Sequence, residues 1–126
     1  MEEKWEARKF EYDFEKLSVY QEAVNLTEKV YEFTTDFPRD ELFAITSQIR
    51  RAAMSIGLNI AEGKGRYFTK VYVQFLYQAR GSLYETIALI KTSHRLKLLS
   101  VSQMEDLLQI AGRVGVQLSN LIKSLK

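Results

Sequence analysis

The chain of 126 residues contains no cysteine and a single histidine, His94. The lack of cysteine excludes a disulfide framework and cysteine-ligated zinc or iron–sulfur sites. One histidine cannot form a histidine cluster, so no metal and no other cofactor is expected. No apolar run approaches the roughly 18 residues of a membrane span, and the charged start is unlike a signal peptide. A cytoplasmic protein without membrane contact is therefore the default expectation.

Turn-forming residues are also scarce, because the sequence has one proline, Pro38, and six glycines. All-β domains need many turns rich in these two residues, so a few long elements are favoured instead. Hydrophobic residues make up 46% and charged residues 27% of the chain, which is a globular composition. The length fits one domain.

Apolar residues recur at alternating spacings of three and four, which predicts helices. Four are expected: residues 15–36, residues 41–62, from about residue 69, and from Ser100 or Ser102 to Leu125. Pro38 ends the first helix, and Asp40 is a candidate N-cap for the second. Gly63 to Gly65 predict a left-handed break after it, and Thr69 could cap the third. Short connections make an all-α, antiparallel up-down four-helix bundle over residues 14–126, preceded by an N-terminal extension of residues 1–13.

The first helix has more apolar surface than one core-facing side needs. One stripe, expected in the core, contains Leu17, Tyr20, Val24, Thr27 and Tyr31. Surplus apolar surface usually meets another subunit, so the remaining apolar residues predict an oligomer interface. It comprises Val19, Ala23, Leu26, Val30 and Phe33, together with Phe43, Met54 and Leu58 of the second helix. The alternative is a thicker monomer core, or a cover formed by N-terminal aromatic residues such as Trp5.

The net charge of +2 conceals an uneven distribution along the chain. Residues 1–36 carry ten acids and five bases, whereas residues 50–97 carry nine bases and two acids. The two segments could complement each other within the molecule. The other interpretation is a basic face for an anionic partner.

The third helix places bases and tyrosines along one line, about 44 Å long at 1.5 Å per residue. The line contains no acid and consists of Arg66, Lys70, Tyr77, Arg80, Tyr84, Lys91 and Arg95. Such a row can neutralise phosphates, and its rings can stack on unpaired bases. A charged row is also the usual appearance of a solvated helix face.

Polar residues interrupt the apolar pattern at the second and third helices: Arg50, Arg51, Asn59, Glu62, Ser82 and Glu85. Antiparallel pairing through a turn at Gly63–Gly65 places residue 45 opposite Glu85, within reach of Arg50 or Arg51. An ion pair that fixes helix register is the favoured interpretation. Acid–base catalysis is the alternative, although no nucleophile–base pair accompanies the carboxylates and no catalytic residue is assigned.

Several short motifs of the sequence are recognisable when taken together. They are Phe14-Glu15-Lys16-Leu17, Phe37-Pro38, Gln48-Ile49-Arg50-Arg51-Ala52, Asn59-Ile60-Ala61-Glu62-Gly63 and Gly81-Ser82 with Glu85. With them the chain resembles the four-helix-bundle proteins encoded in intervening sequences of bacterial 23S ribosomal RNA genes, over about residues 12–124. The resemblance implies an up-down bundle and a ring-shaped homo-oligomer, with a pentamer favoured. The family also resembles the accessory variability proteins of diversity-generating retroelements, which bind nucleic acid and partner a reverse transcriptase.

These features together predict a non-enzymatic, homo-oligomeric accessory protein that binds RNA or DNA through the third helix. The alternative is a scaffold whose basic face docks an acidic protein such as a polymerase, with no direct role in nucleic-acid binding. An enzyme is the third reading.

Overall fold

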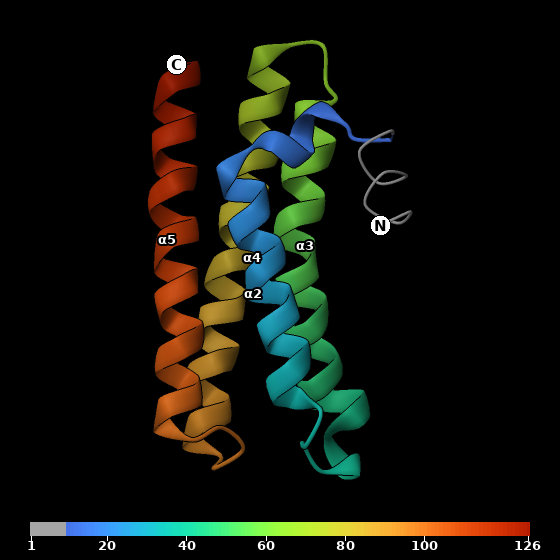
Figure 1. Cartoon of the computed structure of the whole chain (residues 1–126), viewed down its shortest axis with the longest axis vertical. Coiled ribbons are helices and arrows are strands. Elements are labelled where there is room, and N and C mark those ends of the chain that lie inside the picture. Colours follow the sequence, from blue (N-terminus) through green and yellow to red (C-terminus); the bar gives the residue numbers. More distant parts are fainter. Residues whose placement is uncertain (1–9) are drawn as a thin grey trace.

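The computed structural model describes residues 10–126, and this part of the chain folds into long α-helices with no strand. The four helices are α2 (Ser18–Thr34), α3 (Ser47–Lys64), α4 (Thr69–Arg95) and α5 (Val101–Leu125). They run alternately down and up (Figure 1). Helices α2 and α4 each pack against both α3 and α5, so α2 lies diagonal to α4. The predicted all-α four-helix bundle is confirmed. Of the predicted N-terminal extension, residues 1–9, which include Trp5, lie outside the described residues.

Helix α2 buries the stripe that we had assigned to an oligomer interface. Val19, Ala23, Leu26 and Val30 are at most 3% exposed and belong to the bundle core, with Phe33 packed against it. Assigning the four buried residues to an interface was therefore wrong, and Phe33 is partly buried against the same core. The other stripe lies at the edge of the core, since Tyr31 is exposed and Thr27 Oγ1 donates to the carbonyl oxygen of Ala53 on α3 at 3.1 Å.

The second helix begins later than predicted. Residues Arg39–Glu41 form a 3-10 turn and residues Leu42–Thr46 a single π turn, in which Ala44 leaves the helical region (φ −120°, ψ −109°). Asp40 lies inside the first turn and does not cap α3, which starts at Ser47. The irregular turns direct Phe43 away from the bundle, where its side chain is 94% exposed.

The hairpin between α3 and α4 has no left-handed residue, contrary to the prediction. Gly65 has a φ of −80°, and none of the glycines in residues 10–126 has a positive φ. Gly63 instead permits close packing, because an added Cβ would lie 2.7 Å from the Cβ of Phe75 on α4. Thr69 is the first residue of α4, and its N-cap is Phe68.

The connection between α4 and α5 holds the one left-handed non-glycine residue of the described chain, Lys97 (φ 65°). Ser100 then caps α5, because its Oγ accepts a hydrogen bond from the Gln103 backbone N–H at 3.0 Å. Of the two predicted starts, Ser100 and Ser102, the structure has the first. His94 lies half-buried beside this connection, with Nδ1 3.0 Å from the carbonyl oxygen of Leu99.

Candidate nucleic-acid interface

Six of the seven predicted binding residues lie on α4 with exposed side chains. We call them the basic row: Lys70, Tyr77, Arg80, Tyr84, Lys91 and Arg95. Arg66 is not part of it, because α4 begins only at Thr69. The Arg66 guanidinium instead forms an ion pair with Glu62 at 3.1 Å and lies 4.8 Å from the ring centre of Phe75. Arg66 therefore braces the α3–α4 hairpin.

Arg80 and Tyr84 form a pair one helical turn apart in the middle of the basic row. Arg80 Nη2 donates to the Tyr84 hydroxyl oxygen at 3.3 Å, and the guanidinium lies 5.5 Å from the ring centre. This hydrogen bond raises the pKa of the Arg80 guanidinium. The Tyr84 side chain remains 59% exposed. A cation and a flat ring thus stand side by side, open to a ligand.

Lys126, the residue that follows α5, adds a cation that the sequence analysis missed. Its Nζ donates to the hydroxyl oxygen of Tyr77 at 3.0 Å, and this contact lowers the pKa of Tyr77. The antiparallel order of the last two helices places the start of α4 and the end of α5 at the same end of the bundle (Figure 1). The antiparallel order of the helices was therefore the feature of the sequence that could have indicated this contact.

A groove runs between α4 and α5 alongside the basic row. Its walls are Arg80 and Tyr84 from α4, and Gly112, Gly115, Val116, Ser119 and Asn120 from α5. The lining contains no acidic side chain. Gly112 leaves it open, because a Cβ added there would meet nothing within 4 Å.

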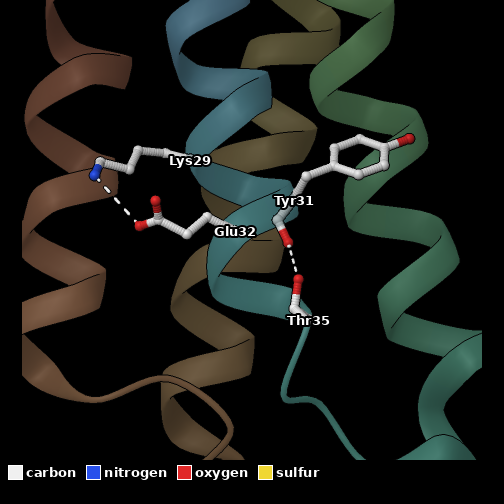
Figure 2. Close-up of polar contacts among 4 residues, drawn as sticks. All are labelled: Lys29, Tyr31, Glu32 and Thr35. Carbon is white, nitrogen blue, oxygen red and sulfur yellow. Dashed lines mark hydrogen bonds and ion pairs between the residues drawn. The ribbon is translucent and has the colours of Figure 1, made fainter.

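Ion pairs do not neutralise the basic row within residues 10–126. Two of the acidic residues of α2 have other partners: Glu32 pairs with Lys29 at 3.4 Å, and Glu22 with Arg113 at 2.7 Å. Figure 2 shows Lys29 and Glu32 extending from α2 on the side of α5. The hydrogen bond from Arg113 also lowers the pKa of Glu22. For the described residues, the acidic first helix therefore does not offset the basic middle.

The predicted ion pair between Glu85 and Arg50 or Arg51 is wrong. Glu85 accepts a hydrogen bond from Gln48 Nε2 at 2.6 Å. Arg50 turns instead toward α2, where Nε donates to Thr34 Oγ1 at 2.8 Å and the guanidinium covers the Tyr31 ring at 4.5 Å. In Figure 2 that ring points from α2 to the side of α3, away from Lys29 and Glu32.

Other residues of the predicted polar network meet between α3 and α4. The hydroxyl oxygens of Ser55 and Ser82 are 2.8 Å apart, and Asn59 Nδ2 donates to Ser55 Oγ at 3.0 Å. Arg51 stays within α3, with Nη2 3.4 Å from Ser47 Oγ. The predicted register placed residue 45 opposite Glu85, but α3 continues to Lys64, and the observed partner of Glu85 is Gln48, which lies further along the chain. These contacts give the network a structural role.

The remaining predicted interface residues lie together on the α2–α3 side of the bundle. Phe43 is 94%, Leu58 60% and Met54 43% exposed, and Leu42 beside them is 43% exposed. We call these four residues the apolar patch. A shallow hollow next to it is bordered by Tyr31, Arg50 and Arg51, among others. Because α2 and α3 are the helices diagonal to α4 and α5, the apolar patch and the groove lie on opposite sides.

Two further observations concern the part of the chain that the structure describes. No group of three or more histidine, aspartate or glutamate side chains is placed to hold a metal ion. None of the helices there combines the length and apolar character of a membrane-spanning segment.

Residues 15–120 match the family model described as 23S rRNA-intervening sequence protein. The fold is similar to the crystal structure of a protein with unknown function from the S23 ribosomal protein family of Bacteroides thetaiotaomicron VPI-5482. That match has a TM-score of 0.75 and 21% sequence identity, and it covers 83% of this chain and 98% of the other. No curated protein matched.

Proposed function

The chain belongs to the family of 23S rRNA-intervening sequence proteins, and we propose that it is a non-enzymatic, self-associating accessory protein that binds nucleic acid. The observation that carries the proposal is the basic row on α4. Its side chains are exposed, and no ion pair within the described chain neutralises them. Lys126 extends the same positive surface onto α5.

Phosphate contacts account for such a row better than a merely solvated face does. From Lys70 to Arg95 the row spans about 38 Å at 1.5 Å per residue, long enough to follow several nucleotides. Ordinary surfaces mix charges of both signs, whereas the acid nearest in sequence to Arg80, Glu85, is held by Gln48 of α3. Binding through this row should be sequence-tolerant and sensitive to salt, because each contacted phosphate releases counterions.

Fluorescence anisotropy of a labelled single-stranded RNA, measured across a salt series, tests this proposal. We expect the logarithm of the affinity to fall linearly with the logarithm of the salt concentration, with a slope of about −0.7 per phosphate contact. The double variant Arg80→Glu, Lys91→Glu should bind far more weakly and with a shallower slope. The matched control is Lys16→Glu, Arg39→Glu, which changes the net charge equally at two exposed positions outside the row.

Two results would overturn the proposal. One is the absence of binding at low salt, and the other is equal binding by the row variant and its control. Either result would favour the alternative, a scaffold that uses the same basic face to dock an acidic protein such as a reverse transcriptase. Pull-down of the purified partner protein, repeated with the row variant, would then decide that alternative.

Self-association through the apolar patch is the second part of the proposal. A side chain as large and as exposed as Phe43 is costly to keep in water, and the apolar side chains of Leu42 and Met54 border the same hollow. Copies joined through this side would leave the basic row of every copy accessible, and a ring would multiply the contacts to one strand. We expect light scattering to give a mass above 14.7 kDa for the native chain and a smaller mass for Phe43→Ser. A clean native monomer would refute this part alone.

A further inference from the structure

The groove between α4 and α5 suggests which form of nucleic acid the basic row binds. Tyr84 and Arg80 form one wall, and Val116 of α5 is 62% exposed opposite them. Gly112 contributes only backbone, so the groove admits a flat group from solvent. Ser119 and Asn120 add polar groups on the α5 side. The groove is therefore apolar and aromatic in one part and polar in another.

This lining matches the chemistry of an unpaired base. Base faces stack on tyrosine rings and on guanidinium planes, and both are present in the Arg80–Tyr84 pair. Base edges carry hydrogen-bond donors and acceptors, and the side chains of Ser119 and Asn120 offer both kinds. Within residues 10–126 these two side chains make no hydrogen bond to the protein, so they are available to a ligand.

We propose that this groove receives one unpaired base of a single-stranded nucleic acid whose phosphates follow the basic row. The base lies against Tyr84, and its edge faces Ser119 and Asn120. A paired duplex keeps its bases stacked and can use only the row. The inference rests on the proposed function and adds to it a preference for single strands.

Two labelled probes of equal length and charge distinguish binding in the groove from binding along the basic row. They are a single-stranded thymidine oligonucleotide and an abasic strand. We expect the native chain to bind the thymidine strand about 5- to 100-fold more tightly, which is the range for one stacked base. Gly112→Leu fills the groove and should abolish this difference while leaving the affinity for the abasic strand unchanged. The control is Gly81→Leu, because Gly81 is also helical and exposed with nothing within 4 Å of an added Cβ, but it does not line the groove.

The outcomes distinguish the two proposals. If the native chain binds neither probe, the proposed function is refuted. Equal, salt-dependent binding of both probes leaves the proposed function in place and overturns the base site. An equal effect of Gly81→Leu and Gly112→Leu also overturns it. Circular dichroism checks that Gly112→Leu folds; if it does not, Asn120→Ala is measured instead and should weaken binding of the thymidine strand only.

Discussion

Replacing two helical glycines by alanine should change stability in opposite directions. At Gly63 the new Cβ would lie 2.7 Å from Phe75 Cβ and 3.3 Å from the Tyr72 carbonyl oxygen, two atoms that the α4 backbone holds in place. Overpacking of this kind costs about 1–3 kcal/mol, and the better helix propensity of alanine offsets up to about 1 kcal/mol. A Cβ–Cβ distance of 2.7 Å calls for the upper part of that cost, about 2–3 kcal/mol, so the free energy of unfolding should fall by about 1–2 kcal/mol for Gly63→Ala.

At Gly112 the same change meets no neighbour. Only the propensity gain remains, so the free energy of unfolding should rise by about 0.5–1 kcal/mol. Urea unfolding followed by circular dichroism measures both variants, at one protein concentration because association would add to the apparent stability. The two midpoints should move to opposite sides of the native value.

Either reversal of sign would refute the reasoning. If Gly63→Ala were as stable as the native chain, α3 and α4 could separate at no cost, and close packing would not be the role of this glycine. If Gly112→Ala were less stable, a neighbour would cover the groove in solution. That second result would also remove the free space on which the base site depends.

Three further contacts give predictions. Ser55→Ala removes the partner of the Ser82 hydroxyl, and Ser82→Ala leaves the Ser55 hydroxyl only its contact with Asn59. Each single change should lower the free energy of unfolding by about 1 kcal/mol, whereas the double variant should cost less than the two single changes together. Ser100→Ala removes the cap of α5 and should cost about 1 kcal/mol in the same urea assay. The pKa of Glu22 lies below its ordinary value of 4.5, so its contact with Arg113 stabilises the fold fully above that pH and loses its effect as the pH falls through the lowered value. Arg113→Met should therefore destabilise the protein at pH 7 and have little effect in strong acid, and equal effects at both would contradict this.

Most of the fold was predictable because helix patterns depend on local spacing. The single proline and the Gly63–Gly65 segment marked connections, and Ser100 marked the start of α5. The errors arose where apolar spacing was ambiguous. Two neighbouring stripes on α2 were both apolar enough for the core, and only packing against the other helices shows that Val19 and Leu26 lie inside.

The basic row of the candidate site could be predicted from the sequence, but the groove beside it could not. Six row residues follow from the periodicity of α4, because exposed positions on a straight helix keep their spacing. Arg66 was included in error, since the pattern does not show where the helix begins. The groove depends on which residues of α5 face α4, and Lys126 reaches Tyr77 from 49 positions away. Such contacts depend on tertiary packing, which a single helix pattern does not contain.

The contact between α2 and α5 also has a consequence for the order of folding. Helices α2, α3 and α4 each pack against the next helix in the chain, whereas α2 also packs against α5, where Glu22 and Arg113 are 91 residues apart in sequence. Loop-closure entropy grows with that separation, so contacts between neighbouring helices form at the lower entropic cost. We expect α2 to dock on α5 after the folding transition state. A change at Arg113 should then accelerate unfolding and leave the refolding rate nearly constant. The contact between α2 and α5 would therefore set the unfolding rate, and with it the lifetime of the folded bundle.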